Sequence, residues 1–243
     1  MRYINDLDVG TRLKNLRLDR EEKMIDIALE FDISMAQYSR LESGKVRISV
    51  DVLGKACQYY NVSIDYILFG EQYSPKSFFF TKVQKFEEKD SRRFLKILSC
   101  LLNLHCFSKQ QKQEPMYKIF AGGLLEMIPP DADNTMPYVL EYERNLQGKS
   151  ENTMIEELGL TRFKWNSIMN GTRVNDVNIP LAISNQFGYD LSFLIQNKLS
   201  ANLFFDDLFF ELEKTHQSHI VTLFDEIITK EGEIYLLETQ KRK

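Results

Sequence analysis

The segment SMAQYSRLESGK, residues 34–45, has the pattern of a short helix with two marked ends. Ser34 can cap the first turn, and Gln37 follows three residues later, as in a capping box. Gly44 can take the left-handed conformation that ends a helix. Tyr38 and Leu41 fall on one face, which we expect to be buried. The opposite face then presents Met35, Ala36, Gln37 and Arg40 to solvent.

Four further short helices are predicted around this segment. Apolar residues recur at helical spacing in residues 9–20 and 24–31. Ser49 and Ser63 each precede another apolar stripe and stand where helix N-caps are expected. Short polar turns separate the stripes. Residues 1–72 are therefore predicted to form a compact all-α unit of five helices.

The order and spacing of these residues resemble the Cro and lambda-repressor-like helix-turn-helix family. The resemblance covers roughly residues 9–70, and it implies a five-helix DNA-binding domain whose third helix enters the major groove. It also implies a structural ion pair between Arg17 and Glu42, which would join the first and third helices. The matching residues are Gly10-x-Arg12-Leu13-Lys14-x-x-Arg17, Ile27-Ala28, Ile33-Ser34, Tyr38 to Lys45 and Val62 to Leu68.

The candidate DNA-binding side chains lie on the third helix and at its ends. Glutamine can pair with adenine, arginine with guanine, and alanine or methionine can contact a thymine methyl group. Met24 stands where the family usually has a polar residue that contacts phosphate, and Lys23 is the nearest substitute. The candidate residues are Ser34, Met35, Ala36, Gln37, Arg40, Ser43, Lys45 and Arg47.

Residues 137–198 repeat the pattern of the first unit at an offset of 127 residues. Two interpretations of this second unit stay open: it binds DNA, or it is a scaffold that pairs with the first unit. Met169 stands in the second unit at the position equivalent to Glu42. Glu151 stands at the start of this unit's second helix, where it would repel phosphate. Aligned pairs include Arg17 with Arg144, Tyr38 with Trp165, Gly44 with Gly171 and Ser63 with Asp190. The candidate DNA-binding residues are Arg162, Phe163, Lys164, Ser167, Asn170, Thr172 and Arg173.

An amphipathic segment follows each unit. Phe94, Ile97 and Leu101 align with Ile220, Leu223 and Ile227 at an offset of 126 residues, and Phe79-Phe80 align with Phe204-Phe205. We expect these stripes to pack on each other or on a second chain. The predicted segments are a helix-turn-helix domain at 1–72, a helical connector and linker at 73–136, a second helix-turn-helix-like domain at 137–198 and a C-terminal helical segment at 199–243.

The composition restricts the class of protein. With 31 basic and 35 acidic residues, a net charge of −4 and 43% hydrophobic residues, the chain has the profile of a soluble folded protein. No apolar run approaches the roughly 20 residues of a membrane span. Three cysteines without regular spacing favour a reducing, cytoplasmic compartment. Phosphate-binding loops, nucleophile elbows and HExxH motifs are not found. His216 and His219 have a spacing that metal ligands can have, but no clear third partner, so we expect no enzyme, cofactor or metal.

The sequence therefore predicts an all-α, sequence-specific transcriptional regulator. Its partner would be double-stranded DNA, and we favour a repressor that occludes a promoter. The chain would work as a homodimer or as an intrachain pseudo-dimer, because one recognition helix reads only a few base pairs. One alternative is a protein-interaction module, such as an antitoxin-like or phage-immunity partner, with auxiliary DNA binding. Another is a ligand sensor with an apolar pocket between the halves.

Overall fold

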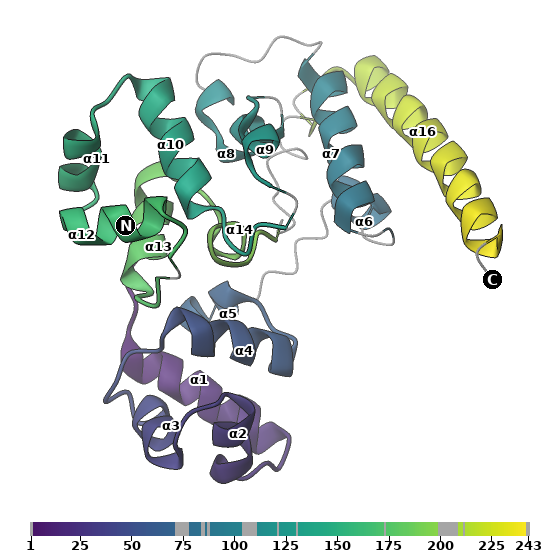
Figure 1. The fold of residues 1–243 in the computed structure, drawn as a ribbon. Coiled ribbons are helices and arrows are strands. Elements are labelled where there is room, and N and C mark those ends of the chain that lie inside the picture. The colour runs from purple at the N-terminus through teal and green to yellow at the C-terminus, as the bar shows by residue number, and fades with distance from the viewer. Residues whose placement is uncertain are drawn as a thin grey trace. The chain divides into compact units, whose positions relative to one another are not determined.

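The computed structural model describes residues 2–70, 78–83, 86, 88–103, 111–120, 122–129, 131–172, 174–198, 209–210 and 212–241. All regular elements in these ranges are helices, apart from an isolated antiparallel bridge between Ser49 and Asp176. The prediction of an all-α fold is thus confirmed. The chain divides into two compact units, one made of Met1–Ser74 with Ile128–Ser200 and the other of Pro75–Met127 with Ala201–Lys243. Figure 1 labels the helices.

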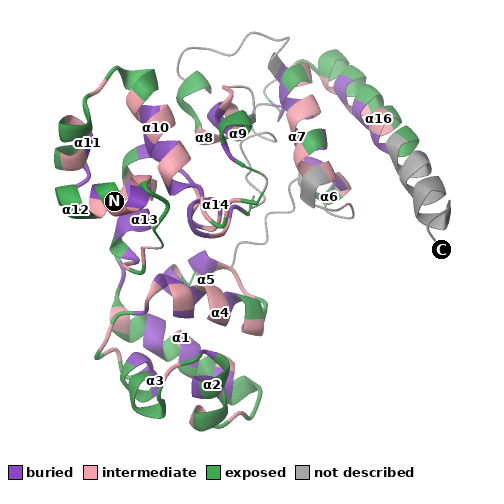
Figure 2. Ribbon diagram, in the orientation of Figure 1, coloured by how far each residue is buried: buried purple, intermediate pink, exposed green. Residues whose placement is uncertain are grey.

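The first five helices form a small bundle around an aromatic and aliphatic core. Each of the serines at the starts of α3, α4 and α5 accepts a hydrogen bond from the backbone N–H three residues later, which satisfies a first-turn donor. Leu13, Phe31, Tyr38 and Leu53 are fully buried, as Figure 2 shows for the inner faces of these helices. The bounds are α1 (Asp6–Asp19), α2 (Met24–Glu30), α3 (Met35–Glu42), α4 (Val50–Tyr60) and α5 (Ile64–Phe69).

Helix α1 approaches the C-terminal end of α3 without intervening side chains. A Cβ atom on Gly10 would lie only 2.3 Å from the carbonyl oxygen of Leu41, and one on Gly44 would lie 2.6 Å from the Cα atom of Leu7. Gly44 also has a φ of 65°, in the left-handed region that favours glycine. These two glycines therefore allow a backbone-to-backbone contact between α1 and the end of α3.

A buried ion pair joins the same two helices. Arg17 donates from Nε to Glu42 Oε1 at 2.6 Å and from Nη2 to Oε2 at 3.1 Å, and both side chains are buried. The remaining Nη1 donates to the carbonyl oxygen of Glu22 at 2.9 Å, so the guanidinium also closes the α1–α2 turn. The hydrogen bond to Glu42 raises the pKa of Arg17, although burial lowers it in part. The pair stays charged and sets how α3 lies against α1.

A second group of five helices follows the same chain path. Its helices are α10 (Met136–Gln147), α11 (Glu151–Glu157), α12 (Arg162–Met169), α13 (Asn178–Phe187) and α14 (Leu191–Gln196). After subtraction of the 127-residue offset, the bounds of α11, α12 and α14 coincide with those of α2, α3 and α5. All five left-handed residues of the first bundle have left-handed equivalents: Glu21, Asp32, Gly44, Asn61 and Gly70 correspond to Gly148, Gly159, Gly171, Gly188 and Asn197.

The core of the second bundle holds a different polar contact. Arg144, the equivalent of Arg17, pairs with Glu141 on its own helix at 2.7 Å. The buried carboxylate of Glu143 instead accepts a hydrogen bond from the Tyr189 hydroxyl at 2.8 Å. Burial, with the nearby Glu143 carboxylate, raises the pKa of Tyr189 and keeps the phenol protonated as a donor. The buried polar contact of the second bundle is thus the hydrogen bond between Tyr189 and Glu143, whereas that of the first bundle is an arginine–glutamate ion pair.

The two bundles touch within the first compact unit. Helix α14 packs against α4 and α5. The carbonyl oxygen of Asn175 accepts a hydrogen bond from the backbone N–H of Val50 at 3.2 Å, and its side-chain Oδ1 accepts one from the N–H of Asp51 at 2.9 Å. The side chain of Asn185 both accepts from and donates to the backbone of Arg2, each at 2.9 Å. Residues that are more than a hundred positions apart therefore complete each other's backbone hydrogen bonds.

The other compact unit contains α6 (Phe78–Val83), α7 (Glu88–Asn103), the short 3-10 helix η1 (Gln111–Gln113), α8 (Pro115–Phe120), α9 (Leu124–Met127) and α16 (Lys214–Lys241). The ring of Phe79 meets Phe209 and Phe224 edge-on, with centroids 4.8 and 5.4 Å apart, and Lys82 pairs with Asp225 at 2.7 Å. Helix α7 also packs on α16. The two amphipathic segments therefore pack on each other, which was one of the two arrangements expected from the sequence.

The buried line of α16 is shifted from the expected one. Ile220, Phe224 and Ile228 are buried, whereas Leu223 is 47% exposed. The expectation that Leu223 lies inward is wrong, because an i, i+4 row that starts at Ile220 passes through Phe224. Phe204 and Phe205, the expected aromatic pair, lie outside the described residues. No described helix is long and apolar enough to cross a membrane.

We expect Gly10→Ala to lower the free energy of unfolding by about 1–3 kcal/mol, because the added methyl group meets backbone atoms of α3 that cannot turn away. Gly54→Ala is the matched control. Its Cβ would meet only the end of the Gln196 side chain at 3.5 Å, so it should stabilise the helix by roughly 0.5–1 kcal/mol. Urea unfolding followed by circular dichroism measures both; equal effects of the two variants would contradict the close α1–α3 contact.

Glu42→Ala should lower the free energy of unfolding by roughly 3–5 kcal/mol, because it leaves the Arg17 guanidinium buried without its carboxylate. The double variant Arg17→Met with Glu42→Leu should recover most of this loss, since no buried charge then remains. Glu30→Ala, at an exposed position on α2, serves as the control. A loss below about 1 kcal/mol for Glu42→Ala would mean that the pair behaves as a surface ion pair.

Candidate nucleic-acid interface

A tight turn connects α2 to α3. Helix α2 ends at Glu30, and Asp32 takes a left-handed φ of 56°. The backbone N–H of Ile33 then donates to the carbonyl oxygen of Ala28 at 2.9 Å, which satisfies one of the last acceptors of α2. Ser34 follows at once as N-cap of α3, and its Oγ accepts from the N–H of Gln37 at 3.1 Å. The two helices are thus joined by a turn of a few residues.

The inner face of α3 is held by packing. Tyr38 is fully buried, and its ring meets the edge of Phe31, with centroids 5.9 Å apart. Burial, together with the neighbouring Tyr60 and Glu42, raises the pKa of Tyr38, so the phenol stays neutral and acts as a packing group. Leu41 is buried beside it. Because these residues and Glu42 all face inward, the rotation of α3 about its own axis is set.

The outer face of α3 is open. Met35 is 54% exposed, and the other members of the face and its ends are exposed as well: Ser34, Ala36, Gln37, Arg40, Ser43 and Lys45. Within the part of the chain that the structure describes, the side chains of Gln37, Arg40 and Lys45 make no hydrogen bond or ion pair. Two cations and an amide therefore stand on one exposed surface with their donors available to a ligand.

Arg47 differs from the other candidates. Its guanidinium pairs with Asp6, with Nε 2.9 Å from Oδ1, and donates from Nη1 to Asn178 Oδ1 at 2.6 Å. The hydrogen bond to Asp6 raises the pKa of Arg47, so the group stays charged. The structure therefore places Arg47 in an exposed contact between the two bundles, where its guanidinium already has partners, unlike that of Arg40.

The corresponding face of α12 carries cations that are already paired. Arg162 donates to Glu151 at 2.9 Å and also to the side chain of Asn152, and Lys164 pairs with Asp176 at 2.8 Å. Burial raises the pKa of Asp176, but the hydrogen bonds from Lys164 and Asn178 lower it by more, so the carboxylate is charged. The two basic side chains thus share their surface with two acids.

The remaining candidates on the second bundle that the structure describes carry no charge. Phe163 is 80% exposed, and the Ser167 hydroxyl donates to its carbonyl oxygen at 3.0 Å. Asn170 is the C-cap of α12 and is exposed, as is Thr172. Arg173 lies outside the described residues. The two faces that look alike in the sequence are therefore different in charge and in the availability of their donors.

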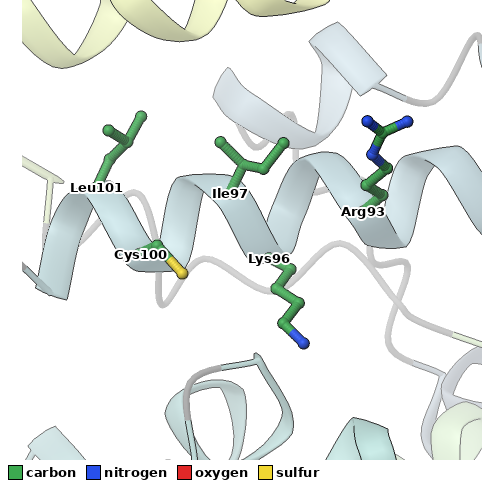
Figure 3. A pocket seen from close by; sticks show the side chains of 5 residues that line it. All are labelled: Arg93, Lys96, Ile97, Cys100 and Leu101. Atoms are coloured by element: carbon green, nitrogen blue, oxygen red, sulfur yellow. The ribbon is translucent and has the colours of Figure 1, made fainter.

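A separate cavity of about 390 Å³ lies along α7. Its described lining comes from two rows of that one helix, as Figure 3 shows: Arg93, Ile97 and Leu101 point to one side, and Lys96 and Cys100 to the other. Lys96 also pairs with Glu126. The cavity has a mostly apolar lining from a single helix and does not lie beside α3 in the sequence or within its compact unit.

Sequence reasoning missed the residues that join the two bundles. Asn175 and Asn185 lie in ordinary polar stretches, and their contacts with Asp51 and Arg2 span more than a hundred positions. Periodicity and capping patterns report only on neighbours within a few turns. The 127-residue offset does align Asp176 with Ser49, and this equivalence is a sequence feature that coincides with the contact.

Residues 13–67 match the family model described as Helix-turn-helix. No curated protein and no solved structure matches the chain. The matched segment runs from the middle of α1 to α5 and includes the α2–turn–α3 element and its exposed outer face. The chain is thus a DNA-binding transcription regulator whose residues 13–67 form a lambda-repressor-like helix-turn-helix domain.

Proposed function

We propose that the protein is a repressor that places α3 in the major groove of an operator and so occludes a promoter. The observation that carries the proposal is the open outer face of α3, where Gln37, Arg40 and Lys45 have no partner among the described residues. A major groove about 12 Å wide admits one α-helix with its side chains. Occlusion needs no catalytic group, because a bound protein excludes other proteins from the same DNA.

The side chains divide into base-reading and phosphate-binding groups. Gln37 and Arg40 are one turn apart on the exposed face, where an amide can pair with adenine and a guanidinium with guanine. Ser34, Ser43 and Lys45 lie at the helix ends, where donors meet the phosphate backbone. Met35 and Ala36 supply apolar contact for thymine methyl groups. The two groups together give register and sequence selection.

We also propose that residues 137–198 are a second, diverged copy of the helix-turn-helix domain. The matching bounds of α11, α12 and α14, and the five left-handed residues at equivalent positions, support this. A left-handed residue is costly outside glycine and asparagine, so five coincidences in one order are unexpected for unrelated helices. The pairing of the two copies in one chain corresponds to an intrachain pseudo-dimer.

A protein-interaction module is the second candidate function. It is favoured by one observation, the 80% exposed ring of Phe163 on a face of α12 whose cations are paired. In that case DNA binding would be auxiliary. The two functions differ in their response to α3 variants, since a protein partner on α12 would not require Arg40.

A mobility shift on the upstream region of the protein's own gene tests the DNA-binding role. Arg40→Ala should cost roughly 1–3 kcal/mol for the preferred base at one position, because a bidentate guanine contact is lost. Arg40→Lys keeps the charge but not the planar fork, so it should lose the same base preference while keeping more of the affinity for unrelated DNA.

Lys45→Ala is the contrasting control. It should weaken binding to all sequences alike and reduce the slope of log affinity against log salt by about 1, because one phosphate contact is lost. If Arg40→Ala weakens binding equally for every sequence, α3 does not read bases through Arg40.

A further inference from the structure

We propose that each chain reads a single DNA half-site, through α3 alone, and that the second bundle is a built-in partner which docks on the first bundle without reading DNA. The inference rests on the proposed function of α3 and specifies the kind of DNA site that one chain recognises.

The contact between the bundles has the form of a twofold interface. Ser49 and Asp176 form an antiparallel bridge, and these two residues are equivalent at the 127-residue offset. In an isologous interface, such as that of a symmetric dimer, residues on the axis meet their own equivalents. A bridge between equivalent residues is the contact that a local twofold axis would give at this point. On this inference, the second bundle takes the place that a partner subunit would have in a homodimer of the first.

Residues of the second bundle cap the first turn of α4 in the first bundle. The first turn of α4 has N–H groups without intrahelical acceptors. Ser49 Oγ accepts from the N–H of Val52 at 3.3 Å, while Asn175 of the second bundle accepts from the N–H groups of Val50 and Asp51. Two of the three donors are thus satisfied by the other half of the chain. Such caps link the start of α4 to the second bundle.

Arg47 extends the same contact toward the reading helix. Its guanidinium bridges Asp6, in the first turn of α1, and Asn178, at the start of α13. The residue lies two positions after Lys45, in the segment that connects α3 to α4. The second bundle thereby holds the segment that follows the reading helix, and this is a positioning role that needs no DNA contact of its own.

Among the residues that the structure describes, α12 and its C-terminal end lack the cations that stand at two positions of α3 and its end. The positions of Arg40 and Lys45 are taken by Ser167 and Thr172, and the Ser167 hydroxyl already donates to its own helix. Arg162 and Lys164 are paired with Glu151 and Asp176, whereas the equivalents of these acids in the first bundle are the uncharged Met24 and Ser49.

The small free energy of these ion pairs determines how they affect DNA binding. An exposed ion pair contributes only about 0–1 kcal/mol, so a phosphate group could displace either acid from its cation. The displaced carboxylates would nevertheless remain beside the DNA and repel its phosphates. The described part of this surface, with two cations and two acids, therefore gains little from counterion release, which is the main source of affinity for DNA.

The decisive experiment selects preferred sites from a random DNA library with the full chain and measures how many chains bind each selected site by native mass spectrometry. We expect one block of base preference per bound chain. Arg162→Ala with Lys164→Ala should change the affinity by less than about twofold and leave the footprint unchanged, whereas Gln37→Ala with Arg40→Ala should lower it more than tenfold.

Two blocks per bound chain, or loss of a block in the Arg162→Ala, Lys164→Ala variant, would overturn the inference while leaving the proposed function intact. If the unaltered chain selects no sequence, the proposed function fails, and the inference fails with it. Gln37, Arg40 and Arg162 are at exposed positions and Lys164 is half-buried, so circular dichroism of each variant verifies that it folds.

A second measurement tests the docking without DNA. Asn175→Ala removes the side-chain acceptor for the N–H of Asp51, so hydrogen exchange at that amide should accelerate on the order of fivefold to tenfold. Asn166→Ala, at an exposed position on α12, is the matched control and should leave it unchanged. Unchanged exchange at Asp51 in Asn175→Ala would show that the second bundle does not cap α4 in solution and would overturn its role as a docked partner.

Discussion

The fit between α1 and the end of α3 is the constraint on which the rest depends. Gly10 brings the helix backbones together, and the buried Arg17–Glu42 pair fixes how α3 is rotated about its axis. Because Glu42 must face Arg17, Tyr38 and Leu41 face the core as well. The opposite side of a two-turn helix is then exposed, whatever its residues are. The availability of Gln37 and Arg40 is a consequence of this packing and not of their own chemistry.

Comparison of the two bundles separates what maintains the fold from what gives it a function. The left-handed turn positions and most helix bounds recur, although the second bundle has a contact between Glu143 and Tyr189 where the first has the arginine–glutamate pair. Caps and turns restrict the backbone directly, so they persist in both. Exposed faces contribute little to stability, and α12 differs from α3 there in both charge and hydrogen bonding.

The contact between the bundles gives the second one a physical role that does not depend on DNA. Asn175 satisfies backbone donors at the start of α4, and Arg47 connects α1 with α13. A free helix-turn-helix domain would leave these donors to water. The second bundle therefore changes the surroundings of the first through hydrogen bonds at one small junction, close in sequence to α3.

Local patterns in the sequence were enough to predict the all-α class, the caps at Ser34, Ser49 and Ser63, and the outward face of α3. Each of these depends on residues within about one or two helical turns of each other, where periodicity and capping rules apply. The contacts of Arg47, the ion pairs of Arg162 and Lys164 on α12 and the burial of Phe224 were not predictable in this way. They arise from contacts between helices that are distant in the sequence. The residues on either side of a side chain do not indicate which distant residue it will contact, or what charge that residue carries.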